Sequence, residues 1–535
     1  MDFFARDDYL NILEKRFRDL KDGFRHNLAI TGEESIGKTS IIQHFLSRFC
    51  DPLILPVYVE IKPQTSLKQF VEKFIAVLLY NFLENSGLKR SEKLNRLIVQ
   101  AKTFLPKTTK EMTEIINAPL KRSSDLFIQL LGLCDSLTSE TKKRCVIVFD
   151  EFQNLENLGI KNIYKQFSKM LMIQKDVLYI LLSSEKFKAK RTLSSKLSLL
   201  FGNFEIVEIQ PFEPNCAENF LQSFLINIKI KKELIDFLLQ FSNSWPYYLK
   251  IIGDALRNYR KTELLSQKEL AQILENLLFD ASGILNLRFR NLLQYLEKAN
   301  FTYRDQRLLY LIACGKNRLK DIEVAWHKSR KAVVNKLNFL IEEDILTKNG
   351  DFYVFNDRIF KFWLRFVWYE GINGQALNLK NERKTFLDRI EEEITQFLLA
   401  SRKPVIERTM QLLNLFGNEK AQIQSKNLRF KPFKEIKPLS FNHETLKEGI
   451  LGRAQDSLWL IGIKQEEPLK EDDIAGFIGE CRRLRYIKLQ TRIIVTDCAI
   501  EPNVRLKALQ EKICLWDIRQ LNYIFDLYNR PRLLV

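Results

Sequence analysis

Glycine and proline are scarce in this chain of 535 residues, which has 19 of the first and 14 of the second. Together they make up about half of their usual share, which argues against a collagen-like, linker-rich or disordered protein. The sequence lacks any apolar run near the roughly 18 residues that a membrane-spanning helix needs. Its first residues, MDFFARDD, have neither the basic nor the apolar region of a secretory signal. We therefore expect no association with membranes.

The eight cysteines are scattered, and they form neither a CxxC pair nor a cluster with histidine. This spacing argues against a disulfide framework and against a structural zinc site. It is typical of a protein that works in a reducing compartment, and it predicts a cytoplasmic location.

Basic residues outnumber acidic ones, with 84 Lys and Arg against 66 Asp and Glu and a net charge of +18. Such an excess predicts an anionic partner, and double-stranded DNA is the first candidate. The alternative is a charge that serves solubility or reflects compositional bias. The apolar share of 46% is sufficient for well-packed cores, and a chain of this length allows about three to five domains.

The clearest motif lies near the N-terminus. Residues 26–31 (HNLAIT) are predicted to form a short buried strand that leads into GEESIGKT, and a helical pattern follows over residues 40–49. This is the GxxxxGK[ST] pattern in a strand–loop–helix setting, where backbone N–H groups and the helix dipole can hold phosphates. Lys38 can neutralise the β- and γ-phosphates, and Thr39 can ligate Mg²⁺. The alternative is a structural glycine turn. The predicted ATP-binding residues are Gly32, Glu33, Glu34, Ser35, Ile36, Gly37, Lys38, Thr39 and Ser40.

A second motif ends another strand. Residues 145–149 are uniformly apolar, as in a central parallel strand, and Asp150 and Glu151 follow directly. Ligands of α/β proteins bind at this end of a strand. We predict that Asp150 holds Mg²⁺, directly or through water, and that Glu151 polarises the attacking water. The alternative is a solvated strand end.

Three more strands complete a predicted α/β fold with a parallel sheet, at residues 52–61, 177–182 and 204–209. A serine follows the second of these strands, at a place between the two motifs. Ser183 or Ser184 could therefore sense the γ-phosphate, and we assign this catalytic role to Ser184. Serine is also common at strand ends.

The N-terminal half resembles the archaeal-type ATPases of the AAA+/STAND group. ITGEESIGKTSII and VIVFDEFQNL resemble the Walker A and Walker B segments of that family, and residues 244–249 resemble its lid motif. Residues 4–10 (FARDDYL) resemble its N-terminal motif near the adenine, which implies nucleotide binding by Arg6. The resemblance covers roughly residues 1–370 and implies ATP hydrolysis with Mg²⁺.

The sequence departs from that family at two positions. Asn203 lies where the family often carries an arginine, and Ser244 replaces the glycine of the lid motif. An arginine that stabilises phosphoryl transfer is worth about 10³–10⁵ in rate. We expect turnover to be slow or to depend on oligomer or partner contacts, with Arg191 as a possible substitute. The basic run that includes Lys186 and Arg191 could contact DNA or a neighbouring subunit, or form a solvated loop.

The middle of the chain is predicted to be helical. Residues 66–142 form an insert, and residues 301–356 have the pattern of a winged helix with Asn349 and Gly350 at the hairpin turn. The basic third helix of that module could enter the major groove of DNA, or the module could be a regulatory lid. The predicted domains are an ATPase core at 1–212, a helical lid at 213–295, a winged helix at 296–372 and a C-terminal domain at 373–535.

The C-terminal domain resembles the restriction-endonuclease-like fold. Active members need an acid and then an acid-x-Lys motif, because two carboxylates hold Mg²⁺ beside the scissile phosphate. Here the second motif is Gly462-Ile463-Lys464, so a glycine replaces the acid. Other carboxylates that could serve are Glu448, Asp456 and Glu480. We predict a catalytically degenerate domain that binds DNA or protein.

Three functions are compatible with these patterns. The first is an ATP-dependent switch that controls binding of DNA or a protein partner, with self-association as one means. The second is an ATP-gated DNA nuclease, and the third is a scaffold that binds ATP without hydrolysing it. A steep loss of DNA affinity with salt would mark contacts to phosphates.

Overall fold

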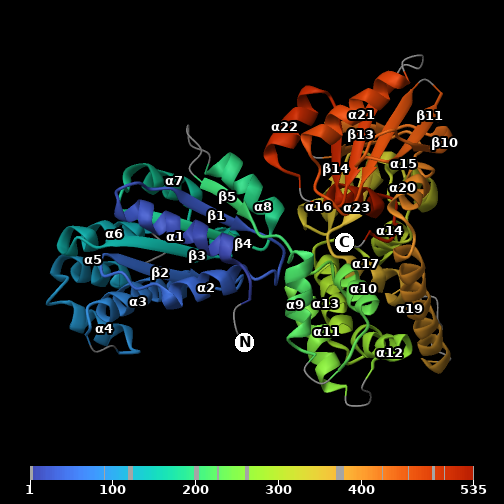
Figure 1. Ribbon diagram of the computed structural model, residues 1–535. Coiled ribbons are helices and arrows are strands. Elements are labelled where there is room, and N and C mark those ends of the chain that lie inside the picture. Colours follow the sequence, from blue (N-terminus) through green and yellow to red (C-terminus); the bar gives the residue numbers. More distant parts are fainter. Residues whose placement is uncertain are drawn as a thin grey trace. The chain divides into compact units, whose positions relative to one another are not determined.

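The computed structural model describes residues 4–88, 91–118, 125–197, 204–225, 228–259, 264–368, 379–423, 426–455, 457–484, 489–498 and 500–533 (Figure 1). The chain divides into two compact units. Unit 1 comprises Met1–Phe220, Trp245–Lys250 and Glu342–Asp344, and unit 2 comprises the remainder. Among the described residues, no helix is both long enough and apolar enough to cross a lipid bilayer.

Unit 1 is built on a five-stranded sheet in the order β2-β3-β4-β1-β5, in which every strand pair is parallel. The predicted α/β fold with a parallel sheet is thus confirmed. The strand β4 lies between β1 and β3, and all three are parallel, so their carboxyl ends meet at the same edge of the sheet. The strands are β1 (Asn27–Thr31), β2 (Ile54–Glu60), β3 (Arg144–Asp150), β4 (Val177–Ser183) and β5 (Phe204–Glu208).

Helices cover this sheet, and the described part of the predicted insert holds four of them between β2 and β3. They belong to a continuous apolar core with the two strands, because their buried faces carry large side chains. The helices of unit 1 are α1 (Asp7–Lys21), α2 (Lys38–Arg48), α3 (Leu67–Asn85), α4 (Leu94–Ala101), α5 (Pro106–Asn117), α6 (Leu126–Thr141), η2 (Phe152–Leu158), α7 (Ile163–Ile173), α8 (Lys186–Arg191) and η3 (Thr192–Lys196).

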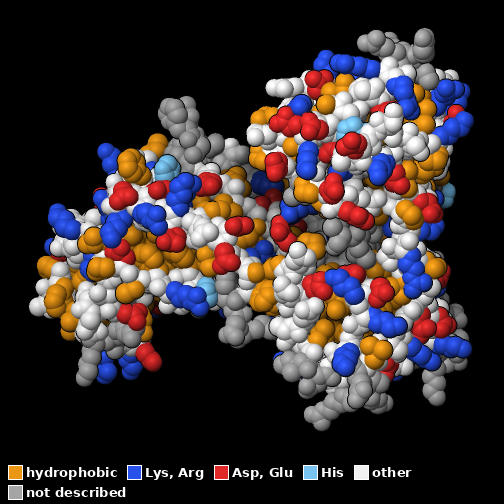
Figure 2. Space-filling view, in the orientation of Figure 1, with side chains coloured by type: hydrophobic (Ala, Val, Ile, Leu, Met, Phe, Trp, Pro, Cys, Tyr) orange, Lys and Arg blue, Asp and Glu red, His pale blue; other side chains and the backbone are white. Residues whose placement is uncertain are grey.

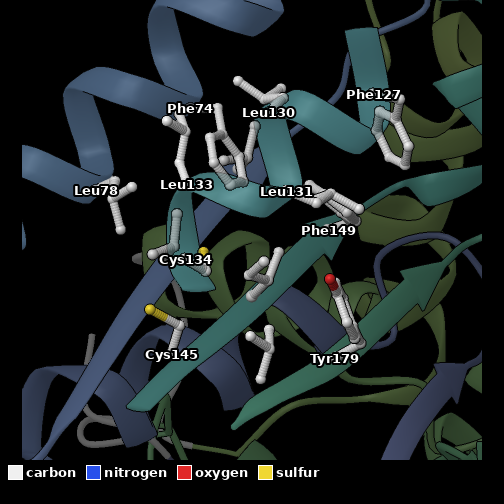
Figure 3. Packing of buried hydrophobic residues seen from close by; sticks show 14 of the residues in the cluster. Phe74, Leu78, Phe127, Leu130, Leu131, Leu133, Cys134, Cys145, Phe149 and Tyr179 are labelled. Carbon is white, nitrogen blue, oxygen red and sulfur yellow. The ribbon is translucent and has the colours of Figure 1, made fainter. Parts of the chain in front are cut away.

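Phenylalanine, with 39 copies, supplies much of this core. Phe127 of α6 lies 6.2 Å from Phe149 of β3 between ring centroids, and 5.8 Å from Phe167 of α7. Figure 3 shows Cys134 and Cys145 pointing toward each other between α6 and β3. Both thiols are fully buried. The abundant aromatic residues therefore pack the sheet against its helices.

The next part of the chain is mainly helical and contains a hairpin, which two short helical elements follow. The order of three helices and two antiparallel strands, α14 to β7, is that predicted for a winged helix. The elements are α9 (Pro214–Gln222), α10 (Lys232–Ser242), α11 (Pro246–Asn258), α12 (Gln267–Leu278), α13 (Ile284–Lys298), α14 (Tyr303–Ala313), α15 (Leu319–Trp326), α16 (Arg330–Glu342), β6 (Leu346–Asn349), β7 (Phe352–Phe355), α17 (Arg358–Trp363) and η4 (Leu364–Trp368).

The C-terminal part of unit 2 contains a mixed sheet in the order β10-β11-β12-β13-β14. Its first two pairs are antiparallel and its last two are parallel. Separate apolar clusters cover its two faces. The elements are α19 (Leu379–Ser401), α20 (Val405–Leu413), β8 (Glu419–Ile423), β9 (Lys426–Phe430), β10 (Phe433–Ser440), β11 (Glu448–Ala454), β12 (Leu458–Lys464), α21 (Glu471–Arg483), β13 (Leu489–Thr496), α22 (Pro502–Gln510), β14 (Cys514–Asp517) and α23 (Ile518–Leu527).

The turn of the β6–β7 hairpin packs against β8 inside unit 2. The Asp351 N–H donates to the Lys420 carbonyl at 2.9 Å, and the Lys420 N–H donates to the Asp351 carboxylate at 2.7 Å. Asn349 pairs with Phe352, so the two turn residues are Gly350 and Asp351. The predicted turn at Asn349-Gly350 is therefore displaced by one residue, because Asn349 stays in the strand and its side chain bonds to the backbone of β8.

Gly350 allows this close approach, and replacing it with alanine should destabilise unit 2. Its φ is +58°, and an added Cβ would lie 2.0 Å from the carbonyl oxygen of Lys420. We expect Gly350→Ala to cost about 1–3 kcal/mol, measured by urea denaturation. Gly315→Ala is the control, since Gly315 also has a positive φ but meets only the end of the Asn529 side chain, at 3.2 Å. Equal destabilisation by both variants would show that backbone strain alone explains the effect.

Candidate nucleotide site

The glycine-rich loop joins β1 to α2 and depends on both of its glycines. Gly37 adopts a φ of +106° just before α2 begins, in the left-handed region that favours glycine. At Gly32, a Cβ would lie 3.0 Å from Ile36 and 3.2 Å from the carbonyl oxygen of Ile209. The loop therefore folds closely over the sheet edge, and the first N–H groups of α2 point out of the helix end, as an anion site requires.

Lys38 is buried in this loop. Its ammonium donates to the carbonyl oxygens of Gly32 and Glu33, each at 2.9 Å. Only 4% of the residue is exposed. Burial lowers the pKa of Lys38, and the carboxylates of Glu151 and Asp150 oppose that shift. The sequence-predicted phosphate-binding lysine thus lies inside the loop, within the field of both strand-end acids.

Asp150 links three elements at the sheet edge. Its Oδ2 accepts a hydrogen bond from Thr39 at 2.7 Å and another from Tyr58 of β2 at 2.6 Å. Its Oδ1 is buried and has no hydrogen-bond partner among the described residues. Burial raises the pKa of Asp150, and the two hydrogen bonds oppose that shift. A buried carboxylate oxygen without a donor, beside a hydroxyl, fits a hard cation such as Mg²⁺, so Thr39 and Asp150 would hold it.

Tyr58 was missed by the sequence analysis. It carries a hydroxyl within the apolar run of residues 54–59 in strand β2, and this contrast was the available signal. Burial and the adjacent Asp150 carboxylate raise the pKa of the Tyr58 phenol. The phenol therefore stays protonated and acts as a donor that orients Asp150.

Glu151 lies directly after β3 and is held by Ser184. Its Oε2 accepts hydrogen bonds from the Ser184 N–H at 2.9 Å, the Ser184 hydroxyl at 2.7 Å and the Gln153 amide at 2.6 Å. The φ of Glu151 is +55°, an uncommon value for a residue other than glycine. Such strain is characteristic of functional sites. It turns the Glu151 side chain toward the end of β4.

The two candidate serines have different neighbours. The Ser183 hydroxyl donates to the Gln153 side chain at 2.7 Å and is fully buried. Ser184 is the serine that contacts Glu151. Gln153, which the sequence analysis did not single out, joins Ser183 to Glu151, because it accepts from the Ser183 hydroxyl and donates to the Glu151 carboxylate.

Arg6 connects the N-terminal segment to the loop. Its guanidinium donates to the carbonyl oxygens of Gln210 at 2.7 Å and Ile36 at 3.4 Å, and it lies 4.5 Å from the ring centroid of Phe212. Burial lowers the pKa of Arg6. The contact with Ile36 places Arg6 beside the predicted phosphate loop, and its role in binding the nucleotide stays a prediction.

Several other predicted residues are not in this site. Arg191 is exposed at the end of α8, and Asn203 lies outside the described residues. From the basic run, Lys186 is the residue that reaches the loop, where its ammonium lies 2.5 Å from the Glu33 carboxylate. Sequence spacing could not distinguish Lys186 from its basic neighbours.

In the C-terminal domain, aromatic rings pack beside Gly462, which replaces the predicted catalytic acid, and beside its strand partner Gly449. Gly462 pairs directly with Gly449 of β11. A Cβ added to Gly462 would lie 3.1 Å from the ring of Phe477, and a Cβ added to Gly449 would lie 2.1 Å from the ring of Phe441. Glu448 is exposed, and Asp456 lies outside the described residues. No group of three potential metal-ligating side chains occurs in the described part of the chain.

Lys464 of this domain is buried among other groups. Its ammonium lies 3.0 Å from Glu467 and 3.7 Å from Asp473. Glu480 accepts a hydrogen bond from the Asn442 N–H at 3.0 Å and pairs with Arg483 at 3.2 Å. Lys464 and Glu480 thus both have partners within the C-terminal domain.

Known proteins match this chain in two ways, through a family model for its N-terminal part and through overlaps with solved structures. Residues 2–163 match the family model of the AAA ATPase domain. No match was found among curated proteins. Solved structures that overlap include a Walker-type ATPase of Pyrococcus abyssi, with 16% identity, a TM-score of 0.49 and coverage of 68% of this chain and 96% of that one. The ORC2 protein of Aeropyrum pernix has 12% identity and a TM-score of 0.42, and the overlap covers 74% of this chain and 95% of that one.

A STAND protein with a tetratricopeptide repeat sensor, from Pyrococcus horikoshii, overlaps with 11% identity and a TM-score of 0.30, and the overlap covers 77% of this chain and 46% of that one. The matched residues include β1, β2 and β3 of the parallel sheet, and β4 and β5 follow them in the chain. Residues 2–163 of this chain are thus similar to the AAA ATPase domain.

Proposed function

We propose that this protein binds and hydrolyses ATP, and that its nucleotide state controls the binding of duplex DNA or a protein partner by unit 2. The observation that carries the proposal is the meeting of a phosphate loop and two strand-end acids at one sheet edge. Lys38 would hold the β- and γ-phosphates, Asp150 with Thr39 would hold Mg²⁺, and Glu151 would orient the water. The hydrogen bonds from Ser184 fix Glu151 for that task.

A basic strip on unit 2 supports DNA as the partner. Figure 2 shows Lys and Arg side chains gathered over the part of unit 2 that carries β10 and β11. Lys426, Arg429 and Lys434, here called the basic strip, are exposed on β9 and at the start of β10. Exposed cations of this kind neutralise backbone phosphates without reading the sequence.

The β6–β7 hairpin is less suited to this task. Its turn is bonded to β8 through Asp351, so that the tip is covered by the chain itself. In α16, Lys336 pairs with Asp305 at 2.7 Å and Arg330 with Glu323 at 3.4 Å. We therefore assign duplex contact first to the basic strip.

Salt titration of duplex binding tests this assignment. We expect the affinity of the full chain for a 30-base-pair duplex, measured by fluorescence anisotropy, to fall steeply with salt. Replacing all three residues of the basic strip with alanine should lower the salt slope by about one for each phosphate that is no longer neutralised. The control is the triple alanine variant of Lys102, Lys107 and Lys110, which removes the same charge from exposed positions of unit 1. A flat salt dependence would contradict DNA as the partner.

The nuclease alternative is disfavoured by the glycine at position 462, where the resemblance calls for an acid and where a Cβ would lie 3.1 Å from Phe477. We propose that the C-terminal domain binds its target without cleaving it. Incubation of the same duplex with Mg²⁺ and ATP should leave it intact on a denaturing gel. Nicking that disappears in Lys464→Ala protein would restore the nuclease alternative.

A further inference from the structure

Lys186 is the first residue of α8 and follows closely on β4. Because β4 lies between β1 and β3, this loop is at the same sheet edge as the phosphate loop and the strand-end acids. The Lys186 ammonium lies 2.5 Å from Oε1 of Glu33 and 3.3 Å from Oε1 of Glu208. Its side chain is 19% exposed. The basic run thus sends one cation into the phosphate loop.

Two ammonium groups converge on Glu33. Lys38 donates to the Glu33 carbonyl oxygen at 2.9 Å, and Lys186 contacts the Glu33 carboxylate. Glu33 belongs to the loop whose backbone is predicted to surround the phosphates of ATP. One cation therefore contacts the backbone and the other the side chain of the same residue of the predicted phosphate loop.

Lys186 is charged in this setting. Burial works against the ammonium, but Glu33 and Glu208 outweigh it and raise the pKa of Lys186. Glu208 has a second partner in Lys190, whose ammonium lies 3.3 Å from its Oε2. If Lys186 turned toward a phosphate, Glu208 would keep an ion pair. The cation can therefore exchange a carboxylate for a phosphate oxygen without leaving Glu208 unpaired.

The other basic residues of this run are engaged or distant. Lys188 pairs with Glu185 on its own segment, and Lys190 is exposed and contacts Glu208 but not Glu33. Arg191 is exposed at the end of the helix. Among the described residues of α8, Lys186 is the cation with a direct contact to the loop.

We propose that Lys186 is a catalytic residue that contacts the γ-phosphate of bound ATP. In hydrolysis, the water oxygen bonds to the γ-phosphorus, the bond from that phosphorus to the β–γ bridging oxygen breaks, and ADP and phosphate result. Lys186 transfers no proton in this step. Its positive charge stabilises the negative charge on the phosphoryl oxygens in the transition state. An arginine in this role raises the rate of hydrolysis by about 10³–10⁵. The inference rests on the proposed ATP hydrolysis.

The test compares four forms of the full chain, namely wild type, Lys186→Ala, Lys186→Arg and the control Lys188→Ala, since Lys188 pairs with Glu185 and not with Glu33 or Glu208. Affinities for ATP and ADP are measured with fluorescent analogues in Mg²⁺, and hydrolysis is measured in single turnover. We expect Lys186→Ala to lower the rate of ATP hydrolysis by about 10²-fold or more and to weaken the binding of ATP. Its affinity for ADP should stay within about twofold of wild type. Lys186→Arg should restore most of the rate, and Lys188→Ala should resemble wild type.

Contrary outcomes separate this inference from the proposed function. If Lys186→Ala protein hydrolyses and binds ATP as wild type does, the role of Lys186 is overturned, while the proposed ATPase function still stands. Equal loss of ATP and ADP affinity would overturn it as well, since it would show a structural ion pair. If wild type binds ATP without hydrolysing it, hydrolysis as the function fails and the catalytic role of Lys186 fails with it. The ATP-over-ADP preference then still reports whether Lys186 contacts the γ-phosphate.

Discussion

Glu151→Gln should reduce ATP hydrolysis by about 10³-fold while ATP binding is retained. Glutamine has nearly the same shape, and its carbonyl oxygen can still accept the hydrogen bonds that Ser184 donates to Glu151. It lacks the negative charge that polarises the attacking water, and a general base of this kind contributes about 10²–10⁴ in rate. Steady-state phosphate release, with and without duplex DNA, measures the loss.

The control for this prediction is Glu156→Gln. Glu156 lies in η2 after the same strand, is exposed and pairs with Lys196. Its replacement removes the same charge from the same segment, and we expect turnover within about twofold of wild type. Normal turnover in Glu151→Gln would show that another group activates the water. Turnover that duplex DNA stimulates in wild type, and that Glu151→Gln loses, would support the proposed switch.

Lys38→Ala should lower ATP affinity by about 10²- to 10³-fold and make hydrolysis undetectable. The ammonium is buried and lies inside the loop, where its two hydrogen bonds to Gly32 and Glu33 also fix the loop's shape. Truncating one partner of a buried charged pair costs about 2–5 kcal/mol, which corresponds to such a loss. Titration with a fluorescent ATP analogue measures it.

Lys62→Ala provides the matched control, because Lys62 follows β2 in unit 1 and its side chain is 58% exposed. Its loss removes one positive charge near the sheet and should leave ATP affinity within about twofold of wild type. Thermal unfolding of both variants shows whether the fold is retained. If Lys38→Ala protein is folded and its ATP affinity is unchanged, the glycine-rich loop is not the nucleotide site.

Much of the fold of unit 1 was predictable because its signals are local. The apolar run at residues 145–149 is buried on both faces, so it can form only an inner strand, and β3 contains it. The glycine spacing of the loop predicts its turn, since Gly37 adopts a positive φ that few other residues tolerate. The predicted helices of the insert also occur, because their apolar spacing matches one helix face.

The site was predictable only in part, because several contacts join segments far apart in the chain. Tyr58 meets Asp150 through the pairing of β2 with β3. The sequence could not distinguish Ser183 from Ser184, since adjacent strand residues point to opposite faces and either could face the loop. The structure brings Ser184 to Glu151.

The sequence by itself determined the phosphate loop, the strand-end acids and the parallel α/β architecture, because each depends on residue types at short spacing. Tertiary structure alone decided which cation of α8 reaches the loop, since the pairing of Lys186 with Glu33 depends on β4 lying beside β1. It also decided that Phe441 and Phe477 fill the space beside Gly449 and Gly462. Such contacts depend on the packing of distant segments, which no local pattern of residues encodes.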